Sequence, residues 1–158
     1  VNETVFILSS PRITDLLTVP PRLEITDAAR LPGSITGGDV LALSQFADLR
    51  SSLTDVSILS SATLPEPTFA RRYRDSDPFA PQPGLLAPLT YDAARMVVEV
   101  LASSGDRRDA AARTLTNLSY TGLNGTIRFE DGYWADAPVM TYTYDENGTL
   151  TPLDHVIE

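Results

Sequence analysis

Short apolar runs alternate with segments of helical periodicity along the first part of the chain. Residues 5–8 form a short apolar run rich in β-branched side chains and predict a buried strand. Residues 31–36 and 56–59 predict a second and a third strand. Between the last two runs, apolar residues recur at helical spacing and predict a helix on which they share one face: Val40, Leu43, Phe46 and Leu49. This alternation predicts an α/β protein with a mostly parallel sheet and flanking helices.

Prolines and aromatic residues dominate the segment after the third predicted strand. Residues 65–67 read Pro-Glu-Pro and predict a hinge or linker. Residues 68–74 predict a short helix that places Phe69 and Tyr73 one turn apart on a single face. Residues 76–88 are proline-rich and predict a loop with local polyproline character.

Two helices and a C-terminal β-hairpin are predicted after this loop. Residues 90–103 give the strongest helical pattern, with Thr90 as N-cap and Gly105 beyond the last turn. Its apolar stripe is predicted to face the core: Tyr91, Ala94, Val98 and Leu101. Residues 106–118 predict an alanine-rich helix. The remainder predicts strands at 126–129, 139–144 and 150–153.

The charge balance argues against a nucleic-acid partner. With 158 residues the chain can bury one respectable core or two small ones, and its formal net charge is −9. A strongly acidic surface repels a phosphate backbone, and no basic stripe compensates. The one local arginine cluster is followed at once by two aspartates and predicts a solvated helix end: Arg71, Arg72, Arg74, Asp75 and Asp77.

Missing residue types narrow the chemistry further. The chain has no cysteine and no lysine, which removes thiol nucleophiles, zinc–thiolate sites and Schiff-base catalysis. His155 is the only histidine, so a site with several histidine ligands cannot form within one chain. A hydrolase using Asp39 or His155 is the weakest alternative, because no Gly-x-Ser-x-Gly elbow presents a nucleophile. We therefore predict no catalytic residues, no metal and no cofactor.

Acidic residues near the C-terminus are better explained as turns than as sites. Residues 145–148 lack the ligand spacing of a calcium loop. The side chains of Glu130 and Asp131 should diverge, so a glycosidase pair built from them with Asp136 is not favoured over a solvated hairpin tip.

Two strand exits are the candidate ligand-binding loops. Gly38 and Asp39 follow the second predicted strand, and Ser9 and Ser10 follow the first. Open α/β sheets bind ligands at the carboxyl ends of their strands. The Asp39 carboxylate can pair with an ammonium group, while serine hydroxyls beside a helix N-terminus suit a carboxylate. Two tight turns in a parallel sheet explain the same residues without a ligand.

The order of several motifs in the second half resembles a known family. These motifs are Phe-x-x-x-Tyr at 69–73, Thr-Tyr-Asp-Ala-Ala at 90–94, Tyr-Thr-Gly-x-x-Gly-Thr-Ile-Arg-Phe-Glu at 120–130 and Asp-x-Asn-Gly at 145–148. Together they resemble the end of the type I periplasmic binding proteins, the class of the leucine/isoleucine/valine-binding proteins. The resemblance is strongest over residues 69–153 and collinear but weaker over residues 5–62.

The resemblance implies parts of two lobes that close on a ligand like a hinged clamp. Residues 1–64 would be the later part of the second lobe, 65–137 the returning part of the first, and 138–158 the final strands of the second. The chain would thus be the C-terminal half of such a protein, and we expect Val1 to be a boundary inside a longer polypeptide. The missing half would leave apolar surface exposed, which predicts a rearrangement or a homodimer.

The resemblance also implies the function. It predicts a periplasmic or extracellular module that binds a small polar metabolite for a membrane permease of an ABC importer or for a sensor. Asp39 corresponds to the acidic residue that pairs with the ligand's ammonium in amino-acid binders, and Ser9 and Ser10 lie in the other pocket loop. Amino-acid binders typically carry an aromatic residue where this chain has Pro11. A receptor or protein-interaction domain of the same fold, docking through residues 78–88, is the alternative.

Overall fold

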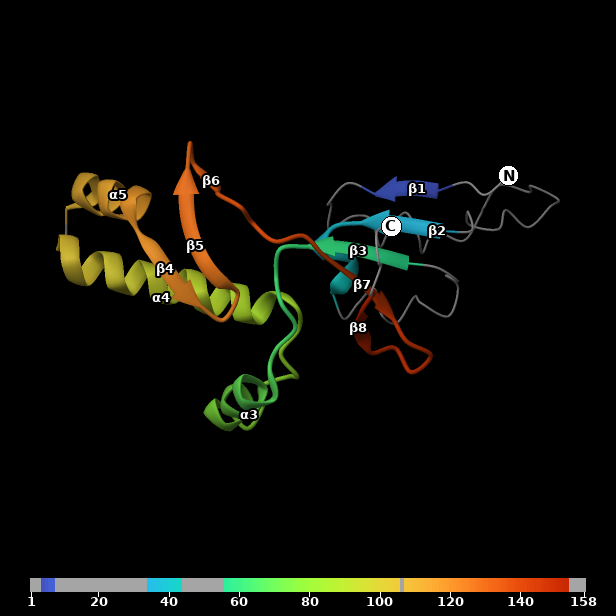
Figure 1. The fold of residues 1–158 in the computed structure, drawn as a ribbon. Helices are drawn as coiled ribbons and strands as arrows, with labels where there is room; N and C mark the ends of the chain where they lie inside the picture. The colour runs from blue at the N-terminus through green and yellow to red at the C-terminus, as the bar shows by residue number, and fades with distance from the viewer. Residues whose placement is uncertain (1–3, 8–33, 44–55, 106, 154–158) are drawn as a thin grey trace, which may run out of the picture. The chain divides into compact units, whose positions relative to one another are not determined.

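The computed structural model describes residues 4–7, 34–43, 56–105 and 107–153 (Figure 1). It divides into two compact units. Unit 1 comprises Val1–Ser60 and Val139–Glu158, and unit 2 comprises Ser61–Pro138. The described chain therefore passes between the units twice, and each unit has its own sheet. No described helix combines the length and apolar character needed to cross a bilayer.

Unit 1 contains one mixed sheet in the order β1-β2-β3-β7-β8. Its strands are β1 (Thr4–Ile7), β2 (Ser34–Gly37), β3 (Val56–Ser60), β7 (Met140–Tyr144) and β8 (Leu150–Pro152). The first three strands run parallel, while β7 pairs antiparallel with both β3 and β8. The α/β class and the C-terminal hairpin predicted from the sequence are confirmed.

The core of unit 1 follows the two-residue period of its strands. Val56, Ile58 and Ser60 are buried along β3, while Leu59 between them is 42% exposed. Ile58 pairs with Tyr142 of β7, and both are almost completely buried. Ile35 of β2 is buried as well, so the centre of this sheet carries a dry apolar layer.

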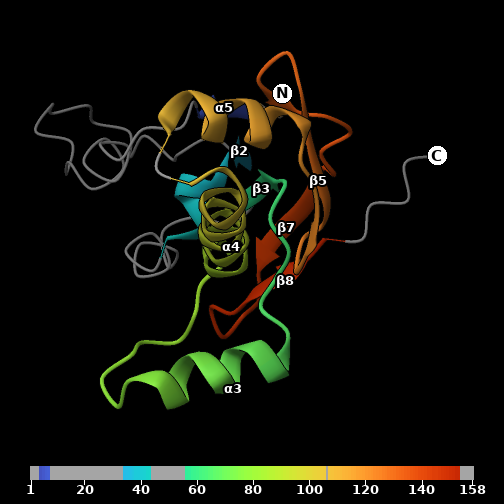
Figure 2. The same cartoon turned by 90° about the vertical axis from the view of Figure 1, so that its left-hand side faces the viewer.

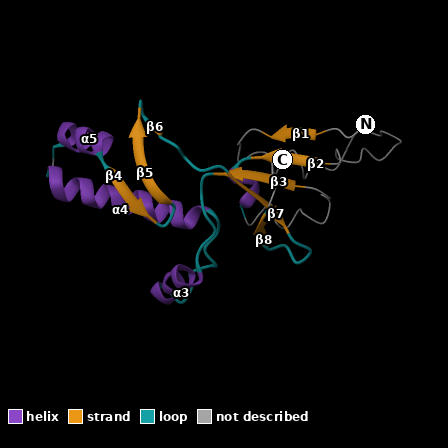
Figure 3. Ribbon diagram, in the orientation of Figure 1, coloured by secondary structure: helices purple, strands orange, loops and turns teal. Residues whose placement is uncertain are grey.

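Unit 2 holds the α-helices of the described chain (Figure 3). They are α3 (Pro67–Ser76), α4 (Leu86–Ser104) and α5 (Arg108–Asn117). A small antiparallel sheet follows, made of β4 (Ser119–Gly122), β5 (Gly125–Glu130) and β6 (Tyr133–Trp134). Helix α5 packs against both α4 and β5 (Figure 2). The buried apolar side chains of unit 2 include Leu85, Met96, Val100 and Ile127.

Helix α4 starts earlier than its sequence pattern predicted. It begins at Leu86, and Thr90 lies inside it rather than at the N-cap. The Thr90 hydroxyl donates a hydrogen bond of 2.8 Å to the Leu86 carbonyl, an interaction that satisfies the hydroxyl within the first turn. The predicted end is confirmed, because Gly105 has a positive φ of 62° and its amide closes the last turn on Leu101.

The face that α4 buries is not the predicted one. The buried side chains are Pro88, Asp92, Met96 and Val100, spaced four residues apart. The predicted stripe is exposed instead, with Val98 at 59% and Leu101 at 50%. Apolar residues surround this helix on most sides, so periodicity alone could not select the buried face. Hydrogen bonds to Asp92, described below, select it.

The helix predicted after β2 is wrong where the structure describes it. Residues Asp39–Ala42 form a short 3₁₀ helix, η1, and Leu43 is already extended. Leu41 is fully buried, and its carbonyl accepts a hydrogen bond of 2.7 Å from the Tyr144 hydroxyl of β7. This one buried anchor fixes the turn without a longer helix. Phe46 and Leu49 lie outside the described residues.

Candidate functional site

The carboxyl end of β2 carries two of the four predicted ligand-binding residues. Strands β1 and β2 are parallel neighbours, with Ile7 beside Gly37. Gly38 follows β2 and precedes η1, and Asp39 is the first residue of η1. The carboxyl ends of both strands therefore meet at one edge of the sheet. Ser9 and Ser10, the other two predicted residues, lie outside the described residues.

Asp39 is held on a rigid turn. The Leu41 amide donates to the Gly38 carbonyl at 3.0 Å, and Leu41 itself is anchored by burial and by Tyr144. Gly38 has φ −90° and ψ −166°, an extended conformation open to any residue, so its backbone does not itself require glycine. The turn thus presents the Asp39 side chain from a fixed backbone.

One carboxylate oxygen of Asp39 has no hydrogen-bond partner. Its Oδ1 atom is buried, yet no donor reaches it within the described part of the chain. A buried acceptor left without a partner costs about 1–3 kcal/mol. In native folds such a group is satisfied by an ordered water, an ion or a ligand, so this oxygen is open to an outside donor. This oxygen can accept a charge-assisted hydrogen bond from an ammonium or guanidinium group.

Unit 2 contains a second buried carboxylate, and both of its oxygens accept hydrogen bonds. Asp92 of α4 is completely buried and accepts three hydrogen bonds from the β4–β5 turn. The donors are the amide of Leu123 at 2.9 Å, the amide of Asn124 at 2.9 Å and the Asn124 side-chain nitrogen at 2.8 Å. These bonds fix α4 to the turn.

Asn124 extends this network to the segment that follows β3. Its side-chain oxygen accepts hydrogen bonds from the Thr63 amide at 2.8 Å and the Thr63 hydroxyl at 3.1 Å. Gly122 lies against the same carboxylate, since a Cβ added there would collide with Asp92 and with the Tyr120 ring. Burial, and then the Asp92 charge, raise the pKa of the Tyr120 phenol above its ordinary value.

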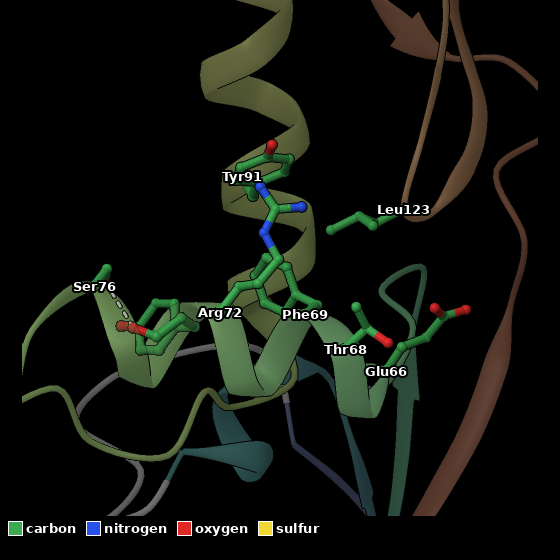
Figure 4. A pocket seen from close by; sticks show the side chains of 8 residues that line it. Glu66, Thr68, Phe69, Arg72, Ser76, Tyr91 and Leu123 are labelled. Carbon is green, nitrogen blue, oxygen red and sulfur yellow. Dashed lines mark hydrogen bonds between the residues drawn. The ribbon is translucent and has the colours of Figure 1, made fainter.

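Aromatic side chains of unit 2 line a cavity of about 320 Å³ between α3, α4 and the β4–β5 turn. Phe69 lies 6.1 Å from Tyr73 and 5.6 Å from Tyr91 by ring centroids, the latter pair edge to face. Arg72 extends from α3 toward Tyr91 and Leu123 (Figure 4). The sequence pattern gave the spacing of Phe69 and Tyr73 but not the cavity.

The acidic residues weighed as a glycosidase pair have another partner. Arg128 forms ion pairs with Glu130 and Asp136, and these hydrogen bonds, Glu130 first, raise the pKa of Arg128 above its ordinary value. Asp145 accepts hydrogen bonds from the amides of Asn147 and Thr149, which is a turn geometry. Within the described residues, no group of three potential metal ligands comes together. His155 lies outside them.

Sequence comparison finds no relative: no protein-family model and no curated protein matches the chain. Solved structures do match. A leucine-binding protein from Thermotoga maritima is 17% identical with a TM-score of 0.61; the match covers 96% of this chain and 43% of that protein. An extracellular ligand-binding receptor from Desulfohalobium retbaense is 14% identical with a TM-score of 0.70, covering 96% of this chain and 26% of the receptor.

A third match is the branched-chain amino acid transporter substrate-binding protein from Streptococcus pneumoniae, solved in complex with isoleucine. It is 14% identical with a TM-score of 0.63, and the match covers 93% of this chain and 42% of that protein. The chain thus spans less than half the length of these proteins. At such identities the likeness shows the fold, and it confirms the resemblance found in the sequence. The matched proteins are binding proteins rather than enzymes.

Proposed function

We propose that this chain, which has the fold of part of a type I periplasmic binding protein, belongs to a protein that binds a small polar metabolite outside the cytoplasm. Two of the matched structures are amino-acid-binding proteins by description. An amino acid or a similar zwitterion is therefore the ligand class we assign. Such a protein catalyses no reaction. The bound ligand stabilises a closed conformation, and a partner protein recognises that conformation.

The observation that carries this proposal is the unpartnered Oδ1 atom of Asp39 at the carboxyl end of a parallel strand. We assign this atom to the ligand's ammonium group. Gly38 would let the ligand approach the backbone beside it, and Ser9 and Ser10 would hold the ligand carboxylate from the exit of β1. These four residues would form one wall of the pocket.

We assign residues 1–64 and 138–158 to the second lobe and residues 65–137 to the first. The division of the described chain into two units supports this assignment. The opening part of the first lobe, with the other wall of the pocket, would come from the portion of the fold that this chain does not span.

The partners we assign are a membrane permease of an ABC importer or a receptor, in the periplasm or outside the cell. A receptor that uses its surface for a protein partner is the second candidate. The proline-rich loop before α4 is its candidate docking segment, and Phe79 in this loop is 92% exposed. Aromatic residues, phenylalanine included, are enriched at the cores of protein–protein interfaces.

Helix α4 also exposes apolar side chains. Val97, Val98 and Leu101 are each about half exposed, and a helix that is apolar on most sides is normally buried. We expect the rest of the first lobe to cover this face in the longer protein, and a second copy to cover it in the isolated chain. Light scattering should then find a dimer that Val98→Glu converts to monomer; a monomeric wild-type chain would contradict it.

Calorimetry with a panel of amino acids tests the proposed function. The longer polypeptide that contains this chain should bind at least one of them, and Asp39→Asn should weaken binding by about tenfold or more, since it removes a charge-assisted hydrogen bond. The matched control is Asp75→Asn, because Asp75 is exposed at the end of α3. Absence of heat with every amino acid would favour the protein-interaction alternative. Equal losses in both variants would remove Asp39 from the site.

A further inference from the structure

The cavity between α3, α4 and the β4–β5 turn has the composition of a ligand site. Its volume of about 320 Å³ suits a small organic molecule. Its lining includes the aromatic rings of Phe69, Tyr73 and Tyr91 and the aliphatic side chain of Leu123. Ring walls of this kind bind planar apolar groups through stacked and edge-to-face contacts.

The wall is rigid on two sides. The edge-to-face pair of Phe69 and Tyr91 joins α3 to α4. On the other side, the amide of Leu123 donates a hydrogen bond to buried Asp92, which fixes the backbone that carries the Leu123 side chain. A ligand that enters would order few further side chains, which limits the entropy lost on binding.

The charges in the lining select the ligand. Arg72 forms no ion pair within 4.0 Å in the described part of the chain. Its side chain is directed toward Tyr91 (Figure 4). Glu66 lines the opposite end, and its carboxylate points away from Arg72 (Figure 4). An unpaired guanidinium beside apolar rings fits a group that is negative at one end and apolar at the other.

We propose that this cavity binds a small monocarboxylate with an aromatic or branched apolar body. Its carboxylate would pair with both terminal nitrogens of Arg72, and its body would lie against Phe69 and Tyr91. The preference differs from that of Asp39, whose free oxygen selects a cationic group. The two sites therefore use separate residues, and this proposal extends beyond the function proposed above.

The expected affinity is low because Arg72 is exposed and its ion pair is screened by water. A ligand of about eleven heavy atoms should bind with a Kd of about 4 mM at the binding free energy per heavy atom that is usual for small ligands. Affinity in this range is measured by titration of the amide signals of isotopically labelled chain in NMR.

The probe is 3-phenylpropanoate, and its neutral amide is the paired probe. We expect the acid to shift the backbone amide signals of Leu123 and Tyr91. The neutral amide probe should bind about threefold to fivefold more weakly, because it cannot form the exposed ion pair. Arg72→Gln should weaken binding of the acid by the same factor and leave binding of the amide unchanged. Arg74→Gln is the matched control: it is exposed on the same helix and outside the lining, so binding should stay within about twofold.

Three results would overturn the proposal: equal binding of acid and amide, an unchanged Kd in Arg72→Gln, or shifts centred on Asp39 instead of Leu123. The spectrum of each free variant establishes that it is folded before titration. Failure here leaves the proposed function intact, because calorimetry with Asp39→Asn tests a different residue and a different ligand class.

Discussion

The two units each bury carboxylate oxygens, and they use them in opposite ways. In unit 2, Asp92 is completely buried and accepts three hydrogen bonds from one turn. In unit 1, Asp39 buries an oxygen that no described donor reaches. The first carboxylate holds a helix and a turn together. The second makes no such bond to the described residues, as the binding role that we propose for it requires.

This difference is the basis on which we propose a structural role for Asp92 and a binding role for Asp39. A saturated buried carboxylate is costly to remove, because its donors are then left buried without an acceptor. A buried carboxylate without hydrogen-bond partners lowers the free energy of unfolding, so its removal should not destabilise the fold. The predictions below use substitutions in each unit to test whether the distinction holds.

The largest effect is expected at Asp92. Asp92→Ala leaves the amides of Leu123 and Asn124 and the Asn124 side chain without their shared acceptor. The free energy of unfolding should fall by about 3–5 kcal/mol, as for other buried charged groups whose partners remain. Urea denaturation followed by circular dichroism measures it. A loss below about 1 kcal/mol would mean that the network is not structural.

Gly122→Ala should have the next largest effect. A Cβ at this position meets the Asp92 carboxylate and the Tyr120 ring, so one of them must move. We expect a loss of about 1–3 kcal/mol in the free energy of unfolding. Gly84→Ala is the control, since nothing lies within 4 Å of its added Cβ and its φ is not positive. The control should be neutral or slightly stabilising, and equal losses at both positions would contradict the packing argument.

Asp39→Asn should leave the free energy of unfolding unchanged or raise it by about 1 kcal/mol, because no described hydrogen bond is lost. The measurement is the same urea titration, made beside Asp92→Ala. A loss comparable to that of Asp92 would show that Asp39 is structural, and the contrast between the two units would fail.

Much of the secondary structure could be predicted from the sequence. Strand β3 and the β7–β8 hairpin were found because a short β-branched run and turn residues act locally. Helix α3 was found within two residues at each end. The buried face of α4 could not be found, since Val97, Val98 and Leu101 are apolar yet exposed, and Asp92 is polar yet buried. Partners distant in the sequence decide that face.

The candidate site was also only partly predictable, because its position depends on local sequence but its hydrogen bonds depend on distant partners. The position of Asp39 at a strand exit follows from a general rule of open α/β sheets. Its unpartnered oxygen does not, because satisfaction of a buried atom depends on every neighbour in space. The aromatic cavity was missed because its lining comes from α3, α4 and the β4–β5 turn. The Phe-x-x-x-Tyr and Thr-Tyr-Asp motifs that meet there were the available signal.

The smallest expected effect is a change in the pKa of Asp109, a carboxylate that is exposed but paired with two arginines. Asp109 at the start of α5 is exposed, and its hydrogen bonds, to Arg113 first and then to Arg107, hold its pKa below the ordinary value. Because the folded pKa is lowered, the stability it contributes is present above the unfolded pKa and is lost as the pH falls through the folded one. Arg113→Gln should raise the pKa of Asp109 toward 3.8, as read by NMR titration of its side-chain carbon. An unchanged pKa would mean that water screens the Arg113–Asp109 ion pair completely. The comparison of the two units would then depend only on their buried carboxylates, Asp92 and Asp39.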